Sequence, residues 1–122
     1  MKPQNEFPLL DTFSKVFDIT PRTIFAYDKN IYCDYPLTDD LLIHEQTHLA
    51  QQEKYGLDKW VEEYLTNSGF RLEMELEAYR NQIVSINDRN QRVRVRIQSA
   101  KDLSSSLYGN IISYDEALKF LS

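Results

Sequence analysis

The only two histidines of the chain, His44 and His48, lie four residues apart and flank Glu45 in the run His-Glu-Gln-Thr-His. On a helix, residues four apart share one face, so both imidazoles can bind one tetrahedral zinc ion. Glu45 would then lie beside the metal-bound water, where a carboxylate can act as general base. The spacing therefore predicts zinc-dependent hydrolysis, and the alternative is a chance pentapeptide on a solvated helix.

A later helix should start near Phe70 and run to about Ile86, and it carries three glutamates. At 100° per residue, one narrow apolar stripe of this helix consists of Leu72, Leu76, Tyr79 and Ile83. Glu75 lies at the edge of that stripe. Glu73 and Glu77 lie on another face with Arg80, where an exposed ion pair is their ordinary role. The helical wheel therefore selects Glu75 as the inward-pointing carboxylate.

The helix that carries the two histidines is expected to begin after Thr38 and to end near Tyr55. Thr38 is a good N-cap, and Gly56 can supply a left-handed C-terminal stop. Apolar residues flank the motif on several sides, which predicts a largely buried helix: Leu41, Leu42, Ile43, Leu49 and Ala50. Buried histidines and carboxylates need partners, and a metal ion supplies one.

Two short strands or a hairpin are expected just before this helix. The runs 23–27 and 31–35 are rich in β-branched and aromatic residues, and Asp28-Lys29-Asn30 between them favours a turn. Zinc proteases commonly present a strand edge in this position, where an extended substrate can pair with it.

The other segments are expected to be mainly helical. The apolar spacing from Leu9 to Phe17 favours a helix within residues 1–20, and residues 57–65 read as a short helix. Residues 90–100 alternate like a strand, but Val93, Ile97 and Ala100 also fit a helix, which we favour. A capping box at residues 113–116 starts a last short helix. The predicted fold class is α+β and mostly helical, with residues 1–122 as one domain.

Composition excludes several other classes of protein. With 122 residues and 42% hydrophobic residues, the chain can build one core. Its net charge of −5 gives no positive case for nucleic-acid binding. Cys33 is the single cysteine, so no intrachain disulfide is expected, and the thiol is expected to be a buried apolar group. Neither a signal peptide nor a membrane span is evident, so we expect a soluble, cytoplasmic protein.

The motif residues also resemble a known family. His44 to His48 followed by Glu75-Leu76-Glu77-Ala78 resembles the gluzincin pattern, in which HExxH supplies two zinc ligands and the Glu of an ExxA segment supplies the third. The wider run over roughly residues 40–120 is similar to small HExxH proteins of bacteriophages and prophages that are described as metallopeptidases. The resemblance implies a minimal zincin-like domain, in which a short hairpin precedes the HExxH helix and a Glu-bearing helix packs on it. For a phage-encoded protein it also implies the host cytoplasm.

The predicted mechanism is hydrolysis of peptide bonds in a peptide or protein substrate. His44, His48 and Glu75 bind zinc, and Glu45 takes the proton from the attacking water and passes it to the leaving amine. Tyr108 could hydrogen-bond a developing oxyanion, although packing on the core is the favoured reading for this loop residue. The alternatives are a catalytically silent structural or assembly protein stabilised by zinc, and a binding module with an incidental motif.

Overall fold

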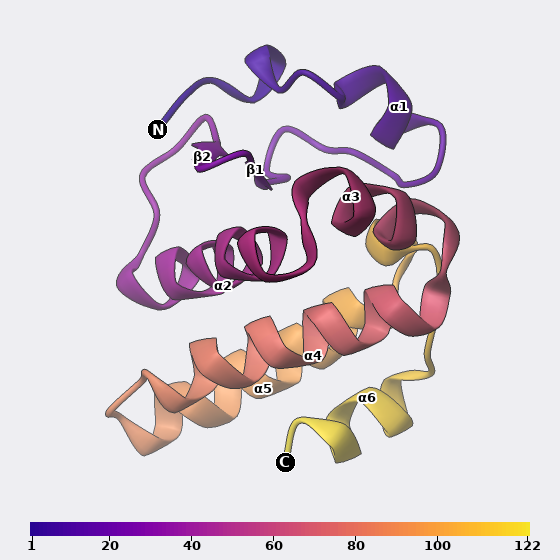
Figure 1. The fold of residues 1–122 in the computed structure, drawn as a ribbon. Helices are drawn as coiled ribbons and strands as arrows, with labels where there is room; N and C mark the ends of the chain where they lie inside the picture. The colour runs from indigo at the N-terminus through magenta and orange to yellow at the C-terminus, as the bar shows by residue number, and fades with distance from the viewer.

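A computed structural model describes all residues 1–122 and is mostly helical, with one small antiparallel sheet (Figure 1). This confirms the α+β class. The elements are η1 (Gln4–Glu6), α1 (Leu10–Ser14), β1 (Phe25–Tyr27), β2 (Asn30–Tyr32), α2 (Asp39–Tyr55), α3 (Leu57–Thr66), α4 (Ser68–Val84), α5 (Arg89–Leu103), η2 (Ser106–Tyr108) and α6 (Tyr114–Phe120). None of the helices is long and apolar enough to cross a bilayer.

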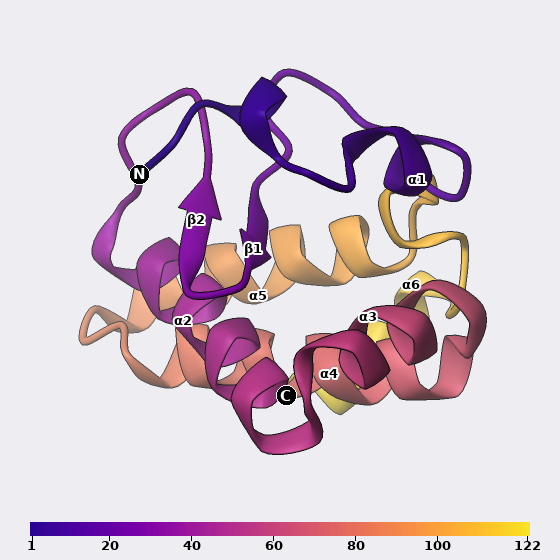
Figure 2. The same cartoon turned by 45° about the horizontal axis from the view of Figure 1, so that its top comes forward.

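The expected hairpin is present, although each strand has only three residues. Phe25 pairs with Tyr32 across it, and the two turn residues Asp28 and Lys29 have φ values of 47° and 70°. Two successive left-handed residues match the twist of an antiparallel pair and close it tightly. Lys2 extends the sheet beside β2 through backbone hydrogen bonds to Ile31 and from Cys33. The other strand, β1, packs on α2 (Figure 2).

Helix α2 has the predicted bounds, and Gly56 ends it with a φ of 91°. Thr38 occupies the N-cap position, but its hydroxyl donates to Asp40 Oδ1 at 2.7 Å instead of accepting from the helix backbone. The expected apolar burial is wrong. The flanking apolar residues are half-buried or exposed, whereas the fully buried residues are polar or charged: His44, Glu45, Thr47, His48, Gln51 and Gln52. The inward face of α2 is therefore the face that carries the motif.

The apolar core lies in two clusters on either side of this polar face. One joins the N-terminal segment, the hairpin and α3, and its buried members are Phe7, Phe13, Phe17, Phe25, Tyr32, Trp60, Tyr64 and Met74. The other joins α4, α5 and α6, and its buried members are Leu76, Tyr79, Ile83, Ala100, Leu103, Ala117 and Leu121. Helix α4 contributes to both clusters and packs against α2, α3 and α5, so its residues lie at the centre of the fold (Figure 1).

The C-terminal half confirms the predicted helices but corrects some details. Helix α4 starts at Ser68 because Asn67 caps it, accepting from the backbone of Phe70. Residues 89–103 are helical, and Ala100 of the predicted apolar face is buried, but Val93 and Ile97 are 42% and 37% exposed, so that part of the predicted face is wrong. The buried residues beside Ala100 are Ser99 and Leu103. The capping box is present, with the Ser113 hydroxyl accepting from the backbone of Glu116.

The other two glutamates of α4 are exposed, as predicted, but neither pairs with Arg80. Arg80 donates to the carbonyl of Phe120 at 3.1 Å, because α6 ends beside it. Glu77 accepts from Gln51 of α2 at 2.7 Å. Glu73 makes neither contact. The expected intrahelical ion pairs are therefore replaced by contacts between helices.

Candidate metal centre

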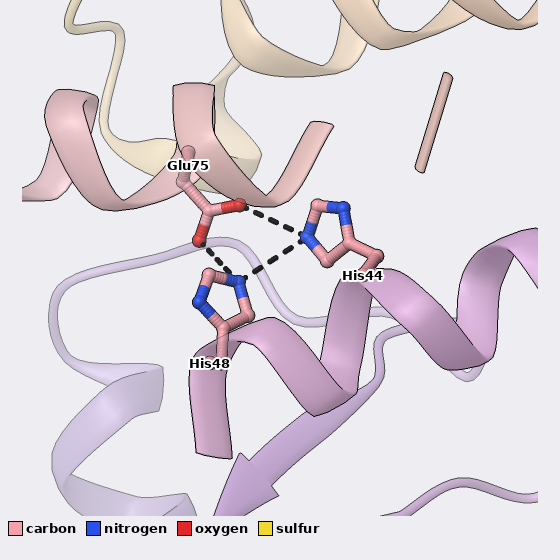
Figure 3. Close-up of side chains that lie close together, drawn as sticks. All are labelled: His44, His48 and Glu75. Atoms are coloured by element: carbon pink, nitrogen blue, oxygen red, sulfur yellow. Dashed lines mark hydrogen bonds and ion pairs between the residues drawn. The ribbon is translucent and has the colours of Figure 1, made fainter. Parts of the chain in front are cut away.

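The three predicted ligands meet between α2 and α4 (Figure 3). His44 Nε2 lies 3.1 Å from Glu75 Oε1, and His48 Nε2 lies 3.0 Å from Glu75 Oε2. The two Nε2 atoms are 3.2 Å apart. All three residues are buried, and Glu75 is only 1% exposed. This buried group could hold a metal ion.

The geometry fits a tetrahedral ion of the size of zinc. Ligand bonds of 2.0–2.1 Å at tetrahedral angles place neighbouring donor atoms about 3.3 Å apart. The two Nε2 atoms are 3.2 Å apart, close to this value, and each lies 3.0–3.1 Å from a different oxygen of Glu75. One donor atom from each of the three residues lies within 4.8 Å of the others. Two histidine nitrogens and one carboxylate also form the donor set of open, three-ligand zinc sites. The residues present therefore fit the ion that the motif implies.

The ring nitrogens on the far side of each imidazole are also bonded. His44 Nδ1 lies 2.9 Å from Gln82 Oε1, and His48 Nδ1 lies 3.0 Å from Gln51 Oε1. Both glutamines are buried, at 4% and 3% exposure. Without a metal ion, the bonds to the Glu75 carboxylate require a proton on Nε2 as well. If a metal ion replaced that proton, an imidazole that donates from Nδ1 would offer the ion its Nε2 lone pair.

Strong charge interactions link the imidazoles and Glu75 when no metal ion lies between them. Burial works against a charge on His48, but the carboxylate of Glu75 outweighs it and raises the pKa of His48 to about 9. Burial also opposes ionisation of Glu75, yet the charge on His48 and hydrogen bonds from both histidines hold the pKa of this carboxyl well below its ordinary value. The group therefore favours one shared positive charge beside the carboxylate, which a metal cation can replace.

Glu45 follows His44 on α2 and is also buried. It lines a cleft of about 630 Å³ together with His44, His48 and Glu75. It forms no ion pair within the chain. Burial raises the pKa of Glu45 above its ordinary value, partly offset by the nearby histidines. A carboxyl group with a raised pKa is a stronger base than an ordinary carboxylate.

Two tyrosines complete the wall beside His44. The ring of Tyr79 packs edge-on against the His44 ring, with 4.4 Å between centroids. The hydroxyls of Tyr79 and Tyr108 are 2.7 Å apart, and both residues line the cleft. Tyr108 is half-buried against the α4–α6 cluster, as favoured from its loop position. Tyr79 therefore contacts a candidate ligand directly.

No protein-family model, curated protein or solved structure matches the chain. The gluzincin resemblance accordingly remains a prediction based on the motif residues.

Three residues that hydrogen-bond the candidate ligands were not identified from the sequence: Gln51, Gln82 and Tyr64. Gln51 lies three positions after His48, and Gln82 lies seven after Glu75, so their helical spacing alone could have suggested them. Tyr64 lies on α3, where its apolar neighbours gave no sign that its hydroxyl donates to Glu75 Oε2 at 2.6 Å. Only the packing of α3 against α4 brings these two residues together.

Proposed function

We propose that the chain is a zinc-dependent peptide-bond hydrolase related to the gluzincin-type metallopeptidases of phages and prophages. The observation that carries the proposal is the convergence of His44, His48 and Glu75 at the inner wall of a cleft that also contains Glu45. The HExxH and ExxA segments support the same reading from the sequence. A structural site needs no base, whereas this one has a carboxylate in the same cleft.

Each residue has a defined role in the proposal. His44, His48 and Glu75 would hold the zinc ion, and a bound ion would supply Lewis-acid activation of the scissile carbonyl and of water. Glu45 would accept the proton of the attacking water and return it to the leaving amine. Two neutral imidazoles and one carboxylate would leave a bound dication with net positive charge, which would favour loss of that proton near neutral pH.

The cleft supports an extended peptide as the substrate. Residues 23–26, at and before β1, form one wall, and Ile24 makes no backbone hydrogen bond within the chain. Its N–H and C=O can pair with a peptide in β conformation. The carbonyl of Ala26 is not available in the same way, because it accepts from Gln52 at 2.7 Å. Pairing would therefore start at the Ile24 end of the strand.

The experiment compares wild type with Glu45→Gln on an unbiased peptide library. The variant keeps the size of the side chain but removes the base, so it should bind zinc and lose hydrolysis by several orders of magnitude. Glu53→Gln, an exposed change on the same helix, serves as the matched control and should cleave like wild type. Equal cleavage by wild type and Glu45→Gln would contradict the proposal.

The second candidate is a zinc-stabilised structural or assembly protein without turnover. It is favoured by the origin of the ligands, since two come from α2 and one from α4, so that an ion would tie the two helices together. Metal binding of this kind contributes directly to folding free energy. No cleavage by wild type, with zinc bound and melting strongly zinc-dependent, would favour this candidate.

A further inference from the structure

We propose that Gln51 and Gln82 are positioning residues that fix both ligand histidines in the Nδ1–H tautomer without adding charge to the site. The inference rests on the proposed metal centre and extends it to residues outside the motif. Both glutamines contact an imidazole through the side-chain oxygen and are themselves held by further partners from other parts of the fold.

The orientation of the Gln82 amide follows from its contact with Asp40, on the side away from His44. Its Nε2 lies 2.8 Å from Asp40 Oδ2, and an ionised carboxylate can only accept hydrogen bonds. The NH₂ group must therefore face Asp40, which leaves Oε1 facing His44 Nδ1 at 2.9 Å. An amide oxygen only accepts, so His44 must carry its proton on Nδ1.

The orientation of Gln51 is fixed by partners of both kinds. Its Nε2 donates to the backbone carbonyl of Met74 at 3.0 Å and to Glu77 Oε1 at 2.7 Å, and both are acceptors only. The indole N–H of Trp60, a donor only, points at Gln51 Oε1 at 3.2 Å. A rotated amide would place two donors against each other at Trp60 and two acceptors at Met74. Gln51 Oε1 therefore faces His48 Nδ1 and imposes the same tautomer.

The two series of hydrogen bonds that start at the histidines have the same composition. One runs from His44 through Gln82 to Asp40 at the start of α2, and the other from His48 through Gln51 to Glu77 on α4. In each, a neutral amide separates the imidazole from a carboxylate. Partners of this type orient metal-bound histidines, and their loss typically weakens metal binding about 10–100-fold.

Neutrality has its own consequence for the chemistry. A carboxylate bonded directly to Nδ1 would make the imidazole a stronger donor and would reduce the positive charge available to polarise water. Glutamine preserves the tautomer but avoids this effect. The glutamines thus have two properties that different substitutions can test separately. Their amides orient the imidazoles, and they are uncharged.

The experiment measures zinc affinity, by competition with a chromophoric chelator, for wild type and four variants. Gln51→Met and Gln82→Met remove the acceptor and should each weaken zinc binding about 10–100-fold. The exchange Gln51→Glu/Glu77→Gln keeps an acceptor for His48 Nδ1 and a donor between positions 51 and 77, so it should keep zinc affinity within a few-fold of wild type. In the cobalt(II)-substituted protein it should also move the pH midpoint of the visible spectrum upward, because the carboxylate now lies beside the imidazole and disfavours ionisation at the metal. Gln46→Met, an exposed glutamine of α2, is the matched control and should change neither quantity.

If a Met variant does not fold, the tautomers of the two histidines can still be tested by a measurement on wild type alone. In the zinc-loaded protein, histidine side-chain ¹⁵N spectra should show both rings bound through Nε2 and protonated at Nδ1. Binding of either ring through Nδ1 would overturn the inference, as would wild-type zinc affinity in both Met variants. Failure of wild type to bind zinc at all would instead overturn the proposed metal centre, so the two failures are distinguishable.

Discussion

Tyr64 of α3 donates its hydroxyl hydrogen to Glu75 Oε2 of α4 across 2.6 Å, inside a fully buried site. The bond fixes the rotation of the carboxylate, because Oε2 is held toward α3 while Oε1 faces His44. Tyr64 is in turn stacked on Trp60, with 4.7 Å between ring centroids. The ligand on α4 is thus oriented by an aromatic pair from a helix that contributes no ligand.

Tyr64→Phe should weaken zinc binding about tenfold, since it removes the partner that orients Glu75. It should also lower the stability of the metal-free protein, because a buried hydrogen bond to a charged group contributes about 1.5–3 kcal/mol. Chelator competition and thermal melting measure the two effects. Tyr55→Phe, which removes an exposed hydroxyl, is the control. Unchanged zinc affinity in Tyr64→Phe would contradict the orienting role.

Glu75→Ala should lower zinc affinity strongly, because it removes one of three ligands. Glu73→Ala should leave it unchanged, since Glu73 is exposed on the opposite side of α4. Glu77→Ala should have a small effect, as Gln51 stays anchored by Met74 and Trp60. Zinc content after dialysis against a weak chelator ranks the three variants. A Glu77→Ala protein that loses its metal while Glu75→Ala keeps it would show that the ligand is misassigned.

The metal-free protein should lose stability as pH rises from 6.5 toward 9. The pKa of His48 is 6.5 in a solvated chain and about 9 in the fold, so the folded state binds this proton more tightly. The resulting stabilisation is complete below pH 6.5 and disappears as pH rises through about 9. Melting temperatures in chelator across this range provide the measurement, and His48→Gln should flatten the dependence. A melting temperature that rises over this interval would contradict the linkage.

Arg71→Lys should destabilise the fold by about 3 kcal/mol or more. The buried guanidinium donates to the carbonyls of Tyr64, Leu65 and Tyr108, and an ammonium group cannot reach all three. The carbonyls at the end of α3 would then lack partners. Chemical denaturation gives the change in free energy of unfolding. Arg89→Lys, at an exposed position of α5, should change it by less than about 0.5 kcal/mol.

Local patterns were sufficient to predict the bounds of α2, the hairpin, the capping box at Ser113 and the inward face of Glu75. Each depends on spacing within one element, which sequence shows directly. The predicted ligands accordingly converge in the structure.

Other features depend on which elements pack together, and the sequence does not show this. Val93, Ile97 and Ala100 fit one helical stripe, but only the Ala100 end of α5 is buried, together with Leu103, so Val93 and Ile97 are exposed. The buried face of α2 is polar because it faces ligands and glutamines, which reverses the usual apolar rule. Tyr64 joins the site only through the contact between α3 and α4.

The most direct test of the central claim is the zinc content of the purified chain, produced without a histidine tag and measured by elemental analysis. Wild type should contain about one zinc per chain, because three buried donors converge at separations that suit one tetrahedral ion. The double variant His44→Ala/His48→Ala should contain none. Wild type that carries no zinc after zinc-replete expression would contradict the metal centre, and with it both proposed functions.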